Sequence, residues 1–381
     1  MDAQATEALL SFFQILPDPR AANRRHLLTD IVTTAILAVF CGAEDWVDVQ
    51  EWGQAQQGWL GEFLALPHGV PSHDTFGEVF ARLDPGAFEA CFMSFSQRLA
   101  DASGGRFIAL DGKTLRRSFR HAWSDTAIHM VSAYVSANRL VLGQLAGEGK
   151  GQELRLILAL LDLLDLRGAT VTLDALGCQK AVAQKILDRG GDYVLALKSN
   201  QPTLHDQTRA LLDEALLEWR DGKPGLKHET YQEVEGDHGR IETRTCWVTH
   251  QVRHLPQALR DQWPGLAALL VVEACRELPG QVPTRERRYF IASHQQASAK
   301  FLAHGVRSHW GVENPLHWQL DVSMREDASR IRLGHGAQNF SRLRRIVLNK
   351  LKREKTKKVG IKCKQKICGW SKDYLLQCLV A

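Results

Sequence analysis

The spacing of apolar residues predicts a helical domain at the beginning of the chain. Over residues 7–100, apolar residues recur at the three- and four-residue intervals of amphipathic helices. Ser72 predicts the N-cap of one of these helices, because Asp74 follows in the first turn, and Pro85 predicts its end. We therefore expect a helical N-terminal domain over residues 1–100.

From residue 106 the pattern changes to short strands that alternate with helices. Three strands with short links predict an antiparallel meander, and a helix, a strand, a helix and a strand follow. This is the element order of an RNase H-like α/β domain, although other α/β folds begin in the same way. The expected strands are 107–110, 129–135, 140–145, 170–173 and 193–197, and the expected helices are 153–164 and 179–189.

A second change of pattern predicts a β-rich insertion over residues 199–294. One amphipathic helix, 204–219, precedes three strand-like runs at 243–249, 269–274 and 288–292. Helical spacing resumes near Ala299. The expected division is thus a catalytic domain over 101–345, which includes the insertion, and a basic C-terminal tail over 346–381.

Composition and charge narrow the class of protein. With 381 residues and 44% hydrophobic content, the chain can bury one large core or two ordinary ones. The formal net charge is only +5, but residues 342–366 carry many Lys and Arg and a single acid, Glu354, so a polyanion is the expected partner.

Cysteine usage and hydropathy indicate a cytoplasmic protein. The eight cysteines are scattered without metal-ligand spacing, which is typical of reduced thiols. Residues 1–10 lack the pattern of a secretory signal, and the longest apolar stretches, 31–41 and 154–166, are too short or too interrupted to span a bilayer.

Asp111 and Asp174 each follow a predicted strand. Sites in α/β sheets are built at strand ends, so the two carboxylates would converge if their strands are neighbours. Facing carboxylates need neutralising cations, and their hard oxygen atoms suit Mg²⁺ or Mn²⁺. The alternative is that each Asp is a turn or helix-cap residue, which is the commoner role of a single Asp after a strand.

Five short motifs, in the same order along the chain, resemble the H-repeat-associated family of bacterial insertion-sequence transposases. The resemblance covers nearly the whole chain. The motifs are FIALDGK at 107–113, LDALGCQ at 173–179, LKSNQP at 197–202, HGRIE at 238–242, and HWGVEN at 309–314 with LHW at 316–318.

The resemblance implies a DDE-type catalytic triad of Asp111, Asp174 and Glu313 on an RNase H-like core, with the insertion before the third acid. It implies two Mg²⁺ ions, for which Mn²⁺ can substitute, and cleavage of double-stranded DNA at transposon ends followed by attack of the 3′-OH on target DNA. A homodimer on DNA, association with the nucleoid and DNA binding by the N-terminal domain are expected. Glu326 and Asp327 are rival third acids, ranked lower because they follow another polar run.

The segment around Glu313 departs from the Tyr, Arg, Glu and Lys signature of a larger related transposase group. The Tyr, Arg and Lys positions hold Val306, His309 and Leu320. Substitutes for gripping phosphate are then Arg307, His309 and His317. Pro315 predicts a new helix with Asn314 as its N-cap, which would leave Glu313 at a break.

Several other side chains are candidates for contact with DNA. Trp310 and Trp318 could share a helix face and stack on an extruded base, with a core role as the favoured alternative. The other candidates, for which a solvated loop or helix is the alternative, are Lys113, Lys198, Asn200, Gln201, Arg240, Arg344 and Arg345.

Two further functions stay open on the sequence alone. The same acids would serve a metal-dependent DNA nuclease that performs no strand transfer. A DNA-binding protein without catalysis would need only the helical domain and the basic end of the chain.

Overall fold

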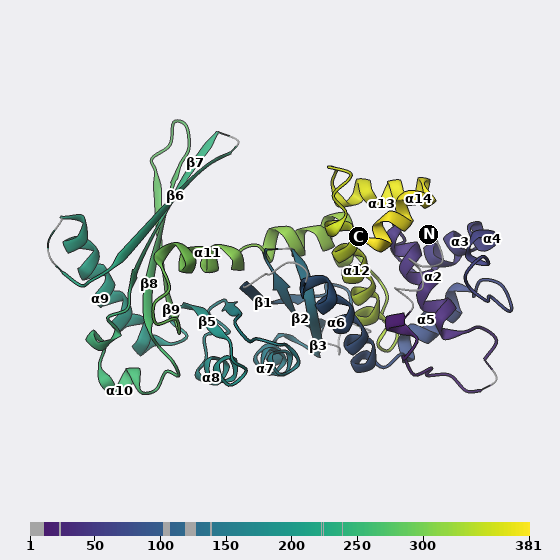
Figure 1. Ribbon diagram of the computed structural model, residues 1–381, viewed down its shortest axis with the longest axis horizontal. Helices are drawn as coiled ribbons and strands as arrows, with labels where there is room; N and C mark the ends of the chain where they lie inside the picture. The colour runs from purple at the N-terminus through teal and green to yellow at the C-terminus, as the bar shows by residue number, and fades with distance from the viewer. Residues whose placement is uncertain are drawn as a thin grey trace. The chain divides into compact units, whose positions relative to one another are not determined.

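The computed structural model divides the chain into two compact units (Figure 1). Unit 1 contains residues 1–104, 112–156 and 312–381, and unit 2 contains 105–111 and 157–311. Each unit is described by itself. The described residues are 11–22, 24–101, 107–118, 127–137, 139–221, 223, 225–237 and 239–381, so residues 7–10 of the expected helical region and His238 lie outside them.

The first part of unit 1 is helical, as expected. Ser72 is the N-cap of α5, since its Oγ accepts the backbone N–H of Thr75 at 3.3 Å, and the helix ends before Pro85. The buried helix α2 is apolar on nearly every side, which is typical of a helix inside a bundle. The helices are α2 (Leu28–Phe40), α3 (Trp46–Ala55), α4 (Gln57–Leu60), α5 (His73–Arg82) and α6 (Pro85–Asp101).

Unit 1 also contains an antiparallel pair, β2 (Ile128–Val135) and β3 (Leu140–Glu148), against which α6 packs. Strand β1 (Phe107–Thr114) is longer than the run 107–110 that the pattern predicts. Its last residues belong to unit 1, and the backbone continues there with a hydrogen bond from Leu115 to Ile128. Asp111 therefore lies within a strand and not just past its end.

Unit 2 is built on parallel strands that continue into an antiparallel extension. β4 (Thr170–Leu173) pairs in parallel with β1 on one side and with β5 (Asp192–Leu197) on the other. The strand order of the mixed sheet is β3-β2-β1-β4-β5-β9-β8-β7-β6. The remaining strands are β6 (Glu229–Asp237), β7 (Arg240–Thr249), β8 (Ala268–Glu277) and β9 (Thr284–Ala292).

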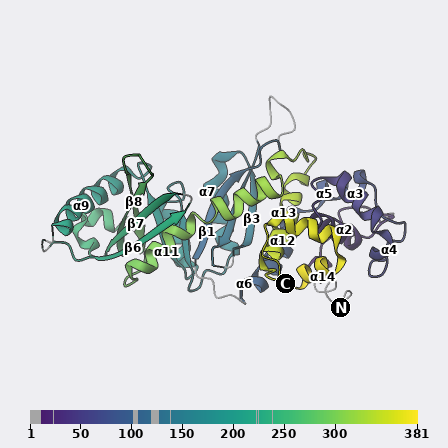
Figure 2. The ribbon, with the colours of Figure 1, turned by 90° about the horizontal axis from the view of Figure 1, so that it is seen from above.

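Helices α9 (Pro202–Arg220) and α11 (Ala299–His309) pack on opposite faces of the antiparallel extension (Figures 1 and 2). Side chains alternate between the two faces of a strand. Leu270 and Phe290 pack with α11, whereas Glu273 receives Arg220 of α9. Shorter or flanking elements are η1 (Lys150–Gln152), α7 (Glu153–Leu163), α8 (Lys180–Asp188), η2 (Val252–His254) and α10 (Gln257–Arg260).

The C-terminal residues, expected to be a basic tail over 346–381, form helices that pack into unit 1. Helix α12 contacts α2, α5 and α6, and nearly all of its residues are buried, including Arg342 and Arg345. Within the part of the chain that is described, no helix is long and apolar enough to cross a membrane. The last elements are a π-helix, η3 (Glu313–Ser323), η4 (Glu326–Ala328), α12 (Gly336–Arg353), α13 (Ile361–Trp370) and α14 (Lys372–Val380).

Candidate functional site

Asp111 and Asp174 occupy matching positions beside two neighbouring parallel strands of unit 2. In the β1–β4 register Leu110 stands opposite Leu173; Asp111 is the next residue of β1, and Asp174 is the first residue after β4. The prediction that their strands are neighbours is confirmed. Asp111 is partly buried and Asp174 is exposed, which makes both accessible to solvent.

One carboxylate oxygen of Asp174 organises the turn that follows β4. Its Oδ1 accepts the backbone N–H groups of Leu176 at 3.0 Å and Gly177 at 3.2 Å. Gly177 has no room for a side chain, because a Cβ atom would lie 2.5 Å from Cδ2 of Leu173. Asp174 therefore has the turn role that was the alternative, and the two backbone donors fix the direction of the carboxylate.

Asn200 and Gln201, two expected DNA contacts, brace this same turn. The side-chain amide of Asn200 donates to the carbonyl of Ala175, and that of Gln201 donates to the carbonyl of Cys178 at 3.0 Å. Lys198, on the same loop, is exposed. The geometry gives the two amides a supporting task beside Asp174 and leaves Lys198 on the surface.

His309 lies close enough to Asp174 to feel its charge. Its Nδ1 lies 3.4 Å from Oγ1 of Thr172, which is two residues before Asp174 and on the same face of β4. Burial lowers the pKa of His309, and the negative charge of Asp174 raises it only in part, so the net shift is downward. Burial therefore favours the neutral form of the imidazole.

Glu313 is the first residue of the π-helix η3 in unit 1, and its side chain lies outside the described atoms. Val312, not Asn314, is the N-cap. The helix follows a turn at residues 310–312. The N–H of His317 donates to the carbonyl of Val312, five residues back, at 3.0 Å, which is the hydrogen-bond pattern of a π-helix. Pro315 is then the third residue, where its missing N–H is tolerated.

No three of the described His, Cys, Asp and Glu side chains are grouped closely enough to hold a metal ion. Asp111 and Asp174 offer carboxylate oxygens, the donors that Mg²⁺ and Mn²⁺ prefer. With Glu313 these acids have the right chemistry for such an ion, and the position of the third carboxylate remains a prediction.

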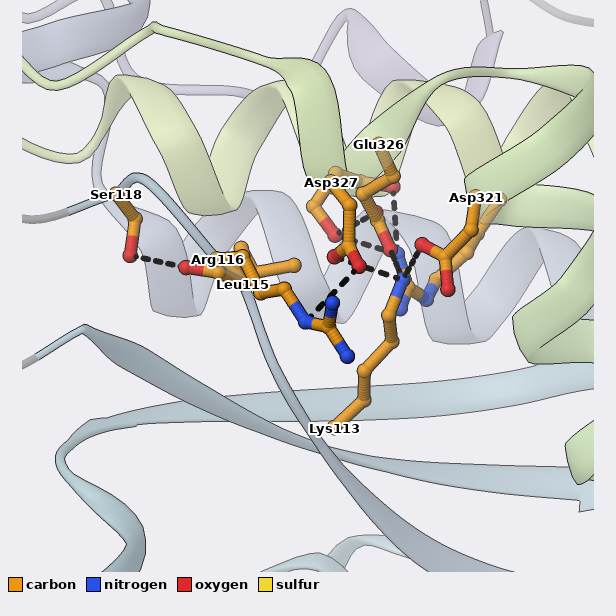
Figure 3. Close-up of polar contacts among 9 residues, drawn as sticks. Lys113, Leu115, Arg116, Ser118, Asp321, Glu326 and Asp327 are labelled. Carbon is orange, nitrogen blue, oxygen red and sulfur yellow. Dashed lines mark hydrogen bonds and ion pairs between the residues drawn. The ribbon is translucent and has the colours of Figure 1, made fainter.

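Lys113 lies in a buried ionic network of unit 1 and not on the surface (Figure 3). Its Nζ contacts Asp321 and lies 2.9 Å from Oε2 of Glu326. The other oxygen of Glu326 accepts from Arg345 and Ser341, each at 2.8 Å. Lys113 was an expected DNA contact, but here it ties β1 to the end of the π-helix and to α12.

The network also bears on the rival third acid. Burial by itself would raise the pKa of Glu326, but Arg345 and Lys113 hold that pKa well below its usual range. Both oxygens of Glu326 are occupied by cations or a hydroxyl, and the side chain is 1% exposed. Glu326 could bind a metal only by giving up these partners, so its geometry does not suit a metal ligand.

Arg344 and Arg345 lie in the interior of unit 1. Arg344 donates to the carbonyl of Glu44, and its guanidinium lies 4.4 Å from the ring centre of Phe340. Burial lowers the pKa of Arg344 to about 10. Because both arginines are covered by protein, we do not include them in a DNA-binding surface.

The two tryptophans are exposed, so their expected core role is wrong. Trp310 is 38% exposed and is the C-cap residue of α11 in unit 2. Cζ of Arg288 lies 4.1 Å from the centre of its ring. Trp318, 52% exposed, belongs to the π-helix of unit 1. They stand on different helices and cannot share a continuous helix face.

The remaining candidates are surface or half-buried residues. Arg307 lies 2.9 Å from Glu235, and Arg240 lies 3.5 Å from Glu242, so both cations have acidic neighbours in unit 2. His317 is half-buried.

All eight cysteines are free, as expected of reduced thiols.

No sequence pattern predicts the ionic contacts among Lys113, Asp321, Glu326 and Arg345. Lys113 and Glu326 are separated by 213 positions, and no periodicity joins them. A buried Lys beside a strand could have been suspected only from its position in β1, two residues after Asp111 and on the same face.

Comparison with known proteins bears on the whole chain. Residues 10–96 match the family described as DDE_Tnp_1-associated, and residues 102–350 match the Transposase DDE domain. The chain is 35% identical over 378 residues to the "H repeat-associated putative transposase YhhI" of Escherichia coli (strain K12), with 97% of each chain covered. It is 46% identical over 288 residues to the "Uncharacterized protein in dhlA 3'region" of Xanthobacter autotrophicus, with 74% of this chain and 93% of that one covered. The resemblance drawn from the five motifs is confirmed.

Proposed function

We propose that this chain, which belongs to the DDE transposase family, binds the terminal inverted repeats of an insertion sequence and catalyses Mg²⁺-dependent cleavage and strand transfer of DNA. The observation that carries the proposal is that Asp111 and Asp174 directly follow paired residues, Leu110 and Leu173, of two neighbouring parallel strands. Strand order β3-β2-β1-β4-β5, with β1, β4 and β5 parallel, supports an RNase H-like core.

Asp111, Asp174 and Glu313 are the residues that would hold the metal. A bound Mg²⁺ would stabilise negative charge on the reacting phosphate oxygens. Backbone groups of the chain orient the carboxylate of Asp174 for this task. The N–H groups of Leu176 and Gly177 fix one carboxylate oxygen and so orient the other.

His309 contributes by remaining neutral. An imidazolium beside Asp174 would neutralise the carboxylate and compete with a divalent cation. Burial lowers the pKa of His309, which favours the neutral imidazole and leaves the negative charge of Asp174 available to a metal ion. We infer that His309 positions β4 through its contact with Thr172 and that it does not supply a positive charge to the site.

The direct test is the Asp111→Asn variant with Mg²⁺ and DNA that contains the repeats flanking the coding region. The wild type should cut at the repeat ends, and the variant should lose cleavage while its affinity for the DNA stays within about twofold, because one charge is removed without a change of shape. Asp206→Asn, at an exposed acid of α9, is the matched control and should cut normally. Wild-type cleavage by Asp111→Asn would refute the assignment.

A second assay separates transposition from simple hydrolysis. DNA with pre-cut 3′-OH ends is offered together with a target plasmid, and joined products are mapped. Joining supports a transposase. Cleavage without any joining would make the chain a metal-dependent nuclease with the same acids.

A further inference from the structure

Two arginine-bearing segments of unit 1 lie next to each other, although they are far apart in sequence. One is the turn after β1, residues 115–118, and the other is the stretch 325–333 around η4. Nε of Arg332 donates to the carbonyl of Arg117 at 2.9 Å. Nε of Arg116 lies 3.3 Å from Oδ2 of Asp327, a contact that Figure 3 shows.

The two segments together carry five arginines, and we call these residues the arginine surface. The side chain of Arg116 is 79% exposed and that of Arg325 is 60% exposed. Within the described residues, no carboxylate lies within ion-pair distance of Arg117 or Arg330, which are both exposed. The members are Arg116, Arg117, Arg325, Arg330 and Arg332.

Backbone geometry adds an independent observation. Arg117 has φ of 84° and Arg325 has φ of 50°, in the left-handed region that glycine occupies without strain. Both segments therefore carry an arginine where glycine would be conformationally easier. Strained backbone of this kind is concentrated at functional sites.

The acids near the arginine surface are already engaged. A groove of about 900 Å³ separates residues 325 and 328–333 from the N-terminal ends of α3 and α5. Each acid on its far wall has a local partner, and one of them, Glu44, pairs with Arg325 of the arginine surface. Glu44 pairs with Lys362 and Arg325, Asp45 caps α3, Asp74 lies near His73, and Glu78 lies near Arg82.

We propose that the arginine surface binds the phosphate backbone of duplex DNA. The inference rests on the proposed function, because DNA is the polyanion that such an enzyme must hold. Arg116 and Arg117 follow Asp111 by five and six residues in the sequence, in the turn directly after β1. Guanidinium groups suit this task because they offer paired donors to phosphate oxygens.

The test measures binding of the full chain to a random-sequence 30-base-pair duplex, without metal, over a range of salt concentrations. Each phosphate contact contributes about 0.9 to the slope of log affinity against log salt. Arg117→Ala with Arg330→Ala should therefore reduce that slope by about two and weaken binding several-fold at low salt. Arg117→Lys with Arg330→Lys keeps the charges and should retain most of the slope.

The control is Arg253→Ala with Arg276→Ala, which removes the same charge from two exposed arginines of unit 2. It should leave the salt slope unchanged. An unchanged slope in the double Arg117 and Arg330 alanine variant, or an equal loss in the control, would overturn the proposal. Because the assay contains no metal, failure of cleavage by the wild type would refute the proposed function without affecting this result.

Discussion

At the scale of single residues, Glu326 is the side chain on which unit 1 depends most directly. It is 1% exposed and lies between Lys113 and Arg345. We expect Glu326→Gln to lower the free energy of unfolding by about 3–5 kcal/mol, because it leaves two buried cations without their shared anion. The measurement is urea unfolding followed by tryptophan fluorescence.

Asp327→Asn is the matched control for that change. Asp327 is next in sequence and interacts with the same lysine, but at 3.7 Å and with a side chain 24% exposed. Its loss should cost less than about 1 kcal/mol. Equal costs for the two variants would contradict a buried ionic centre at Glu326.

Lys350 gives a prediction about pH at the same scale. Its ammonium lies 5.4 Å from the ring centre of Phe95, and burial lowers its pKa to about 8 from 10.5. Between these two values the unfolded chain binds more protons than the folded chain, so this residue makes stability rise with pH. Lys350→Met should flatten that rise between pH 8 and 10.5, measured as the pH dependence of Tm.

The exposed Lys366 provides the comparison, since Lys366→Met should preserve the wild-type pH dependence. A rise of equal steepness in Lys350→Met and wild type would show that the ammonium is hydrated in the folded protein.

At the scale of elements, Lys113 joins β1 to the π-helix that begins at Glu313. We expect Lys113→Met to reduce Mg²⁺-dependent cleavage roughly 10- to 100-fold, because a small displacement of a catalytic group is that costly. Affinity for DNA should stay within about twofold, since Lys113 is buried. Cleavage and the dissociation constant are measured on the same repeat DNA.

Lys198→Met supplies the opposite pattern. Lys198 is exposed, so its loss should weaken binding in a salt-dependent way and affect the chemical step little. If Lys113→Met also reduced the slope of log affinity against log salt by about one, Lys113 would be a DNA contact and not a buried link between β1 and the π-helix.

The elements that the sequence predicted best are those with a strong internal pattern. Strand β4 has the predicted bounds, and α7 and β2 differ from theirs by one residue, because their apolar spacing is unambiguous. Strand β6 was not predicted. Its sequence, ETYQEVEGD, is rich in acids that suit an exposed edge strand but have low β-propensity.

The candidate site was predictable in part for the same reason. Asp111 and Asp174 follow apolar strands, and their pairing follows from strand order. The interior position of Arg344 and Arg345 could not be predicted, because a basic helix reads as a surface until its acidic partners are known. The groups that hold this helix can lie far away in sequence: Arg342 pairs with Glu89, 253 positions earlier, and Arg344 donates to the backbone carbonyl of Glu44, 300 positions earlier.

At the scale of the whole molecule, unit 1 is assembled from both ends of the described chain. Helix α12 packs on α2, α5 and α6, and α13 packs on α2. Glu354, at the end of α12, receives Tyr374 at 2.7 Å and Lys364 at 3.0 Å, and these contacts help to lower its pKa to about 2. The last helices therefore complete the core that the N-terminal helices begin.

We accordingly expect a chain truncated after Glu354 to lose the cooperative unfolding of unit 1. The truncation removes the buried residues Tyr374, Leu375 and Leu379 and leaves the carboxylate of Glu354 without two partners. Calorimetry and limited proteolysis would record a lower Tm and cleavage within α2–α6. A basic extension that only binds DNA would behave differently, since its removal would preserve Tm and weaken DNA binding alone. That second result would show that residues 355–381 act as a DNA-binding tail and do not stabilise unit 1.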